Sequence, residues 1–397
     1  MRAWHLLVHG TRFGTRADAL CYVPLSLSFG ARLNLALQPP QHAAAAAHLE
    51  DEAHHVRSQR PVQPLHVVYV ASSQFCLRSV LVLKKLGDEL LPQFMFALRS
   101  LRDDFGLRCV VERDVYDRLS VFDGFGFVST FFVTDAANGE LAATTDFVVC
   151  LGGDGVILHA SSLFSGPAPP IISFHLGSLG FLTTHRFEDF KEEISALIHG
   201  DGLLGGAYIT LRMRLRCELL RRGVHEGTYE VLNEMVVNRG NNPYLSKIEC
   251  YERDRLITKV QADGVIVATP TGSTAYSVSA GGSMVHPCVP AMLFTPVCPH
   301  SLSFRPVILP DSAELELRIP KDARDTAWVS FDGKSRHELR RGDAVRVRMS
   351  PNPLPTINKE LQTNDWFGSL GRCLNWNERV EQGGLTSLGN TPHMPHP

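Results

Sequence analysis

The sequence lacks long apolar runs and paired cysteines. None of its apolar stretches is long enough for a membrane-spanning helix, which needs about 20 mostly apolar residues. Its 9 cysteines stand singly, without a C-x-x-C pair. In a chain of 397 residues this spacing indicates reduced thiols rather than a disulfide framework. We therefore expect no membrane partner and a reducing, cytosol-like compartment.

Neither sign of charge is in excess. The chain has 39 Lys and Arg residues against 41 Asp and Glu residues, a formal net charge of −2. It has no basic block of the kind that binds nucleic acid, so we expect no nucleic-acid partner. A hydrophobic content of 44% is ordinary for a soluble globular protein, and the length predicts about two or three domains.

The usual phosphate and nucleophile motifs are also absent. The nearest approach to a P-loop is Gly333-Lys334-Ser335, but Trp328 stands where that motif needs its first glycine. No H-R-D kinase loop and no Gly-x-Ser-x-Gly nucleophile elbow occurs. A kinase or hydrolase activity would therefore depend on residues outside these motifs.

Two short histidine and cysteine pairs offer four possible zinc ligands, which are His286, Cys288, Cys298 and His300. Their spacing is not that of a standard zinc site, and a proline within each pair shapes a loop. Histidines and acids also gather between residues 48 and 55, but clustering alone fixes no coordination geometry. Buried thiols and a solvated polar segment are the favoured interpretations, so we expect no protein metal site.

Residues 1–63 differ in composition from the rest of the chain. They contain an alanine run at 43–47, several prolines, and only Asp18 as an acid before Glu50. Organelle transit peptides are similarly basic and poor in acids, although an incomplete N-terminal gene model would look the same. We expect a targeting or linker segment without regular structure.

Residues 64–205 alternate between strand-like and helix-like segments. Apolar runs predict strands at 80–83, 109–111, 147–151 and 171–174, and helical spacing predicts helices at 88–104, 156–164 and 187–198. This alternation is typical of an α/β, Rossmann-like domain with helices on both faces of a parallel sheet. Ligands of such domains bind at the carboxyl ends of the strands.

Residues 206–357 show a period of two instead. Strands are predicted at 210–219, 229–237, 247–251, 265–268, 313–319, 327–331 and 344–349. We expect an all-β domain of two packed sheets, a β-sandwich. In residues 358–397, an amphipathic helix at 365–374 is expected to return to the first domain.

The most informative segment is Gly152-Gly153-Asp154-Gly155, which follows the apolar strand at 147–151. Glycines let the backbone turn tightly and approach a ligand closely. The N–H groups at the start of the next helix suit an anion. We expect Asp154 at the site of chemistry, although a glycine-flanked aspartate is also an ordinary turn.

A second polar cluster comprises Asn233-Glu234, Asp263-Gly264 and the segment 269–277. In that segment 6 of 9 residues carry hydroxyls, more than a helix cap or turn requires. Hydroxyl and backbone groups suit a ribose or a base edge, and Tyr276 offers a stacking face. The cluster predicts a nucleotide cradle, and its alternative is an exposed strand end.

The glycine loop and the second cluster together resemble the NAD kinase family, with similarity from about residue 80 to residue 380. Residues 373–379 resemble the plastid-type plant and algal enzymes of that family. The resemblance implies ATP-dependent phosphorylation of the 2′-hydroxyl of the adenosine ribose of NAD, giving NADP, with Mg²⁺ accompanying ATP. It also implies a homo-oligomer in the chloroplast stroma, with the cytoplasm as the alternative location.

The resemblance also implies roles for individual residues. Asp154 matches the proton acceptor, and Asn233, Glu234 and Asp263 match positions that hold the ribose and nicotinamide parts. Phe181 matches an aromatic near the adenine, and Cys298 a small residue lining the pocket. The remaining matched positions are Gly152, Gly153 and Gly155 in the loop, and Thr274, Ala275, Tyr276 and Ser279 along the NAD pocket. We expect this site between the two domains.

The chain departs from the family at His175, where many members have Asn, so a pH dependence could enter. Plastid-type relatives carry a calmodulin-linked N-terminal region, but residues 1–63 contain no long basic amphipathic helix, so we do not expect calmodulin control. Two alternative functions stand beside the kinase: a non-catalytic NAD(P)-binding sensor and a lipid kinase of the diacylglycerol or sphingosine type. NAD against NADH, and ATP against polyphosphate, stay open.

Overall fold

A computed structural model describes residues 3–8, 21–26, 66–70, 77–137, 139–177, 180–199, 206–359 and 362–377. Most of the segment 1–63 and the last two residues of 373–379 lie outside these ranges. Two strands, Ala3–Val8 and Cys21–Ser26, lie within residues 1–63, so the expectation of no regular structure is wrong at these positions. The targeting or linker role of the segment stays a prediction. None of the helices that the structure describes is long and apolar enough to cross a membrane.

The first half of the chain forms a parallel sheet with the strand order β8-β7-β4-β5-β6. Its strands are β4 (Ser79–Lys84), β5 (Arg108–Val111), β6 (Ser129–Thr130), β7 (Phe147–Leu151) and β8 (Ile171–His175). The chain order reverses direction between β4 and β7, which are neighbours in the sheet. Such a switch point opens a crevice at the carboxyl ends of the two strands, and the glycine loop follows β7 there.

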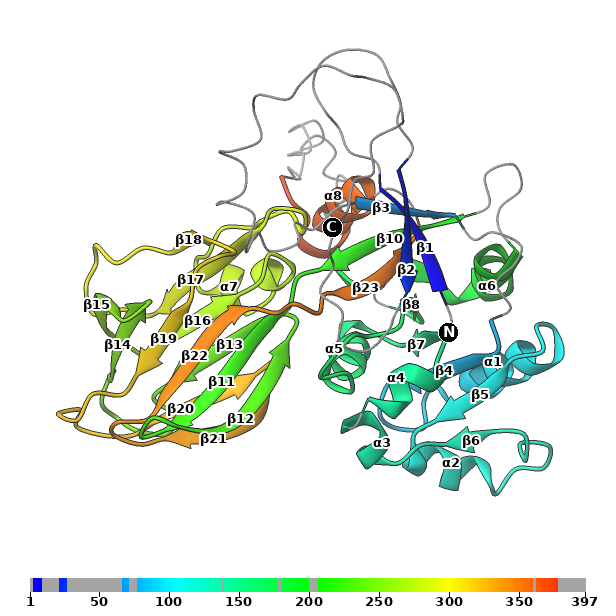
Figure 1. Ribbon diagram of the computed structural model, residues 1–397, viewed down its shortest axis with the longest axis horizontal. Helices are drawn as coiled ribbons and strands as arrows, with labels where there is room; N and C mark the ends of the chain where they lie inside the picture. The colour runs from blue at the N-terminus through cyan, green and yellow to red at the C-terminus, as the bar shows by residue number, and fades with distance from the viewer. Residues whose placement is uncertain are drawn as a thin grey trace, which may run out of the picture.

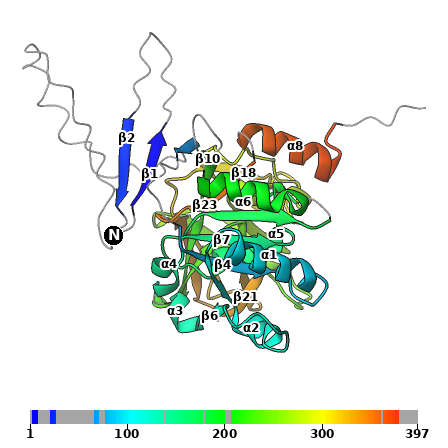
Figure 2. The same ribbon diagram turned by 90° about the vertical axis from the view of Figure 1, so that its right-hand side faces the viewer.

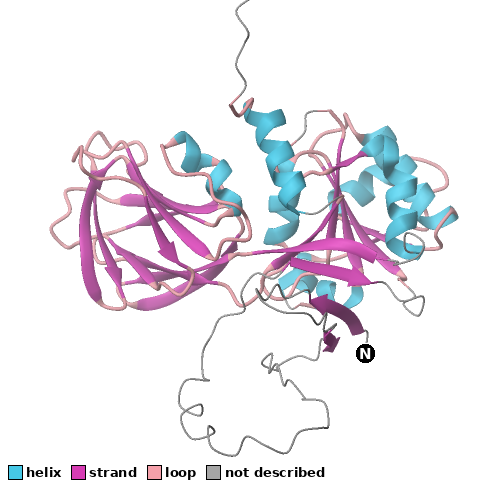
Figure 3. Ribbon diagram, turned by 90° about the horizontal axis from the view of Figure 1, so that it is seen from above, coloured by secondary structure: helices cyan, strands magenta, loops and turns pink. Residues whose placement is uncertain are grey.

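Helices cover both faces of this sheet, as predicted (Figure 3). Successive β4 residues point to opposite faces: Val80 and Val82 belong to one apolar cluster, and Leu81 and Leu83 to another. The first cluster includes α1 (Leu91–Asp103) and α6 (Phe190–His199), and the second includes α4 (Glu140–Thr144) and α5 (Asp154–Ser162). The smaller elements are α2 (Arg113–Leu119), α3 (Val133–Ala137), β9 (His185–Arg186) and the 3-10 turn η1 (Phe187–Asp189).

Two strands from the second half of the sequence extend the parallel sheet. They are β23 (Leu354–Asn358), which pairs with β8, and β10 (Gly206–Arg212), which pairs with β23. Beyond β10 lie β3 (His66–Val70), β1 (Ala3–Val8) and β2 (Cys21–Ser26). After β10 the chain crosses to the β-sandwich formed by β11 to β22, and it returns before β23. The two crossings run side by side (Figure 1).

The prediction of one strand over 210–219 is wrong. β10 ends at Arg212 and β11 begins at Leu215 in a different sheet. The alternation of polar and apolar residues continues through Met213-Arg214 because both sheets bury alternate residues, so the pattern does not reveal the crossing. The expected division into domains stays a prediction.

The strands from β11 to β22 form a β-sandwich, as predicted. One sheet has the order β12-β11-β22-β19-β14-β15 and the other β18-β17-β16-β13-β20-β21. Alternate residues from both sheets, such as Leu215, Val237 and Val345, form one buried cluster between them. The first sheet comprises β11 (Leu215–Arg221), β12 (Val224–Val231), β14 (Ser246–Glu252), β15 (Arg255–Ala262), β19 (Leu315–Arg318) and β22 (Ala344–Met349). The second comprises β13 (Glu234–Asn238), β16 (Gly264–Ala268), β17 (Ala291–Val297), β18 (Val307–Pro310), β20 (Ala327–Phe331) and β21 (Lys334–Leu339).

The C-terminal helix α8 (Gln362–Leu374) follows β23 and packs back against the body of the protein (Figure 2). Ser369 and Leu370 are each only 1% exposed. The ring of Trp366 meets the ring of His286 edge-on at 5.0 Å between centroids. α8 therefore joins the α/β half to a loop of the β-sandwich.

Candidate functional site

Asp154 is the first residue of α5 and is held by three donors. Its carboxylate accepts the backbone N–H of Phe181 at 2.8 Å and of Leu182 at 3.0 Å, and lies 3.4 Å from the hydroxyl of Thr183. The side chain is half-buried. The loop after β8 thus fixes the orientation of a carboxylate that stands at the switch point of the sheet.

Two glycines make this arrangement possible. Gly152 has φ +140°, a conformation that other residues rarely adopt, and a Cβ there would lie 2.9 Å from Val156. At Gly180 a Cβ would lie 2.0 Å from Asp154 Oδ1. The sequence did not single out Gly180 or Thr183, although Gly180 directly precedes Phe181, one of the predicted site residues.

Asn233 and Glu234 lie at a break between two strands, so the prediction of one strand over 229–237 is wrong. β12 ends at Val231 and β13 begins at Glu234. The carboxylate of Asp332 accepts the N–H groups of Leu232, Asn233 and Glu234 at 2.8, 2.7 and 3.1 Å. These groups are thereby removed from the strand ladder. Asp332 comes from the β20–β21 turn, about 100 residues away, and its pKa is raised by burial.

Glu234 is a buried acid with one unused oxygen. It is 8% exposed, and burial followed by the negative charge of Asp332 raises its pKa to about 7. The backbone N–H of Tyr276 donates to the carboxyl group, but Oε2 has no hydrogen-bond partner among the described residues. A buried acceptor without a partner is rare and marks a place where a ligand donor could bind.

The hydroxyl-rich segment is used mostly for structure, which corrects the expectation that its hydroxyls face a ligand. Thr269 donates to the Leu232 carbonyl at 2.6 Å, Ser273 donates to the Val285 carbonyl at 3.1 Å, and Ser277 bonds the hydroxyl of Thr295 at 2.9 Å. All three are fully buried, because the 3-10 turn η3 (Thr271–Thr274) packs under the strand break.

The other predicted residues of this segment are accessible. Tyr276 is 45% exposed, Thr274 and Ala275 are half-buried, and Ser279 is exposed at the end of α7 (Tyr276–Ser279). Gly272 brings the turn against Asn233, since a Cβ on it would lie 2.1 Å from the Asn233 carbonyl oxygen. The structure therefore brings Asn233, Glu234 and the 274–279 segment together.

Asp154 lies at the junction between the α/β half and the segment that carries Asn233 and Glu234. Leu232, beside Asn233, packs in the same apolar cluster as Val156 and Ile157 of α5. The buried guanidinium of Arg212 bonds Thr356 at 3.0 Å and Thr271 at 3.5 Å. Burial lowers the pKa of Arg212 to about 10, and the charge of Asp154 opposes that shift. The sequence did not single out Arg212, because it stands at an ordinary polar position of an alternating strand.

Asp263 and Cys298 lie elsewhere in the chain. In the β13–β16 pair Glu234 stands opposite Ala268, whereas Asp263 precedes Gly264 at the other end. Five strand residues separate the ends by about 17 Å. Asp263 is bonded by Arg239 at 2.7 Å, and Cys298 is exposed just after β17. Within one chain the structure does not bring these two residues to Asp154.

The four histidine and cysteine residues weighed as zinc ligands form no centre. Among the described residues there is no group of three or more His, Cys, Asp or Glu side chains placed to hold a metal ion. His286 Nδ1 instead accepts the N–H of Cys288 at 3.2 Å. His175, the departure from the family pattern, is half-buried at the end of β8, opposite Arg186 of β9.

Two family models match the chain. The model of the ATP-NAD kinase N-terminal domain matches residues 97–202, and that of the ATP-NAD kinase C-terminal domain matches residues 232–359. Together they contain the glycine loop, the strand break and the hydroxyl-rich segment. The resemblance to the NAD kinase family that these segments predicted is therefore confirmed.

Individual relatives support the same assignment. The chain is 64% identical over 310 residues to NAD kinase 2, chloroplastic, of Arabidopsis thaliana and 63% identical over 310 residues to the probable NAD kinase 2, chloroplastic, of rice. In both cases 78% of this chain is matched, but it spans only 31% of the relative's length. The expected resemblance to plastid-type plant enzymes is thus confirmed.

A solved structure is similar over almost its whole length. Yeast NADH kinase complexed with NADH superposes with a TM-score of 0.70 at 31% identity, covering 82% of this chain and 95% of that one. The α/β and β-sandwich halves are therefore arranged as in that enzyme. On these grounds the chain belongs to the NAD kinase family.

Proposed function

We propose that this chain transfers the γ-phosphoryl group of ATP to the 2′-hydroxyl of the adenosine ribose of NAD, giving NADP and ADP. The observation that carries the proposal is the position of Asp154, which is held by three donors beside the strand break that bears Asn233 and Glu234. A carboxylate fixed at a nucleotide pocket is what phosphorylation of a weakly nucleophilic hydroxyl requires.

In this proposal Asp154 acts as the general base. As the ribose oxygen forms its bond to the γ-phosphorus, the hydroxyl proton moves to the Asp154 carboxylate. The bond from the phosphorus to the bridging oxygen breaks, and ADP leaves with that electron pair. The three donors to Asp154 hold its carboxylate in one orientation, so little rearrangement is needed when the proton moves.

The remaining residues at the junction bind the dinucleotide. Glu234 Oε2, the buried acceptor without a partner, receives a ligand hydroxyl. Tyr276 presents an exposed ring for stacking. Asn233, Phe181, Thr274, Ala275 and Ser279 complete the pocket around these two groups, and Gly152, Gly153 and Gly155 leave room for phosphates at the start of α5.

Magnesium fits this site as a companion of ATP. The described residues hold no cluster of three or more ligating side chains, and Mg²⁺ in such enzymes is held by substrate phosphates with one or two carboxylates. Asp154 and Glu234 are the carboxylates at the junction. When bound, the ion would neutralise charge on the transferred phosphoryl group.

A second copy of the chain is proposed to complete the pocket. Asp263 and Cys298 match family positions, yet they lie about 17 Å along the sheet from Asn233. A neighbouring copy can bring them to the dinucleotide, which agrees with the expected homo-oligomer. Light scattering of the purified chain, together with the NAD affinity of Asp263→Ala, tests this arrangement.

The chloroplast stroma is the proposed location, supported by the two relatives described as chloroplastic, with the cytoplasm as the alternative. We do not propose control by calmodulin. A fluorescent fusion of residues 1–397, compared with one of residues 64–397, would distinguish the two compartments.

The decisive experiment measures NADP formation by the purified chain, with NAD or NADH as acceptor and ATP or polyphosphate as donor. Formation of NADP from NAD and ATP supports the proposal. Tight NAD binding without turnover would support the non-catalytic sensor instead. Phosphorylation of diacylglycerol or sphingosine without NADP formation would restore the lipid-kinase alternative.

A further inference from the structure

Arg214 is a fully buried cation at the crossing between the two halves. It lies between β10 and β11 and is 0% exposed. Its carbonyl oxygen accepts the N–H of Ser350 at 2.8 Å. Since Ser350 belongs to the second crossing, which leads from β22 to β23, Arg214 connects the two crossings through its backbone.

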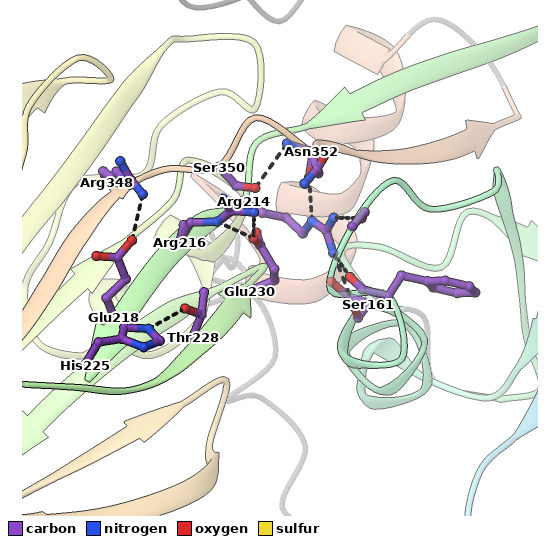
Figure 4. Close-up of polar contacts among 12 residues, drawn as sticks. Ser161, Arg214, Arg216, Glu218, His225, Thr228, Glu230, Arg348, Ser350 and Asn352 are labelled. Atoms are coloured by element: carbon purple, nitrogen blue, oxygen red, sulfur yellow. Dashed lines mark hydrogen bonds and ion pairs between the residues drawn. The ribbon is translucent and has the colours of Figure 1, made fainter. Parts of the chain in front are cut away.

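The guanidinium of Arg214 reaches out of the β-sandwich to α5 (Figure 4). Its Nη atoms donate to the carbonyl oxygens of Ser161 at 3.3 Å, Phe164 at 2.7 Å and Gly166 at 2.7 Å. Its Nε donates to the carbonyl of Asn352 at 2.6 Å. One side chain therefore bonds the end of α5 and the second crossing at the same time.

This contact satisfies the C-terminal end of α5. The last carbonyls of a helix lack partners within the helix, and they carry the negative end of its dipole. A cation with several N–H groups suits that position well. α5 begins at Asp154 and ends at Ser162, so Arg214 holds one end of a helix whose other end carries the proposed base.

The neighbouring arginines behave differently. Arg216 bonds Glu230 at 2.8 Å and Arg348 bonds Glu218 at 2.6 Å, both within the β-sandwich (Figure 4). Every hydrogen bond described for the Arg214 side chain goes to a backbone carbonyl. Burial lowers the pKa of Arg214, and the charge of Glu230 opposes that shift.

We propose that Arg214 is a positioning residue for phosphoryl transfer. It fixes α5, and through α5 the carboxylate of Asp154, relative to the crossings that carry the β-sandwich. The pocket residues Asn233 and Glu234 belong to that sandwich, so the bonds of Arg214 set the distance between base and bound dinucleotide. This inference rests on the proposed function.

The kinetic test is Arg214→Lys, which keeps the charge but cannot span the four carbonyls. We expect kcat to fall about 10-fold to 100-fold, because a displacement of about 1 Å at a reacting group costs about 10²-fold. KM for NAD should stay within about twofold. The matched control is Arg216→Lys, whose kcat should stay within about twofold. A similar loss in both variants, or no loss in Arg214→Lys, would overturn the proposal.

A double mutant tests whether the effect passes through Asp154. In an Asp154→Asn background, Arg214→Lys should lower the residual rate by less than about twofold, because the positioned base is already gone. If Arg214→Lys instead lowered the residual rate by its full factor, Arg214 would act on some other group and the proposal would fail.

Hydrogen exchange supplies a measurement that needs no activity. Without substrates, the amides of α5 should exchange faster in Arg214→Lys than in the wild type, while those of α1 stay unchanged. A wild-type chain that forms no NADP would refute the proposed function, and unchanged α5 exchange would refute the role of Arg214. If Arg214→Lys does not fold, Ser350→Ala provides the milder test. It removes the hydroxyl that accepts the Asn352 N–H at 3.1 Å. We expect a fall in kcat and a faster exchange of the α5 amides, both smaller than those expected for Arg214→Lys.

Discussion

The Asp332 carboxylate accepts the backbone N–H of Asn233 at 2.7 Å. Its bonds to the flanking N–H groups of Leu232 and Glu234 complete a set of three that interrupts the strand. An acid in one hairpin turn thus shapes the segment that bears the proposed dinucleotide contacts, although it is separated from that segment by about 100 residues. The pocket is therefore built by a long-range contact.

Asp332→Asn should weaken NAD binding. The amide keeps the shape, but its NH₂ group cannot accept the hydrogen bonds that the second carboxylate oxygen accepts. Leaving buried N–H groups without partners costs about 1–3 kcal/mol each. We expect the NAD dissociation constant, measured by calorimetry, to rise at least about fivefold. An unchanged constant would mean that Asp332 does not shape the pocket.

Asp154→Asn should abolish most turnover and leave NAD affinity within a few-fold. The amide keeps the shape of the side chain but cannot accept the proton, a loss of about 10²–10⁴ in rate. Initial rates of NADP formation and the NAD dissociation constant are the two measurements. Near-normal turnover would contradict the assignment of Asp154 as the base.

Gly180→Ala should reduce kcat strongly. The new Cβ would lie 2.0 Å from Asp154 Oδ1, so the carboxylate must leave its present position and lose its bonds to the 181–183 backbone and hydroxyl. A fall of about 10²-fold corresponds to displacement of the base by about 1 Å. Gly126→Ala is the control, since a Cβ there meets nothing within 4 Å. Equal rates in the two variants would refute the steric argument.

Glu234 should make folding stability depend on pH. Burial and the charge of Asp332 raise its pKa from 4.5 to about 7, so the folded state binds more protons than the unfolded state between these values. The free energy of unfolding should therefore fall as pH rises from about 4.5 to about 7, by about 3 kcal/mol, with no further change from this group above pH 7.

Glu234→Gln removes that titration. In urea unfolding between pH 5 and pH 8, the variant should lose most of the decline that the wild type shows, and it should be the more stable protein at pH 8. Residual decline in the variant would come from Asp332, whose pKa is also raised. The same slope in both proteins would contradict the assignment to Glu234.

Local signals predicted much of the fold and the first part of the site. The strand β7 (Phe147–Leu151) and the strands β20 and β22 were predicted at their observed bounds. The glycine loop and the helix after it were also predicted. The spacing of apolar residues and the positions of glycines shape the chain over only a few residues. These signals are therefore visible in a single sequence.

The sequence could not show where alternating strands change sheet or break. Nothing in the pattern distinguishes Met213-Arg214 from the strand residues around it, because both sheets bury alternate positions. The break at Asn233 depends on a carboxylate from another hairpin. Buried arginines such as Arg212 and Arg214 also occupy positions that the alternation assigns to the wet face of a strand.

By itself, the sequence determined the two kinds of secondary structure, the glycine loop with Asp154, and the polar segments of the pocket. Only the tertiary structure decided that the hydroxyls of Thr269, Ser273 and Ser277 form hydrogen bonds within the protein. It also decided that the buried Oε2 of Glu234 has no hydrogen-bond partner among the described residues. The physical reason is that composition and spacing fix which groups can form hydrogen bonds. Packing between segments distant in the chain decides which of those groups are left for a ligand.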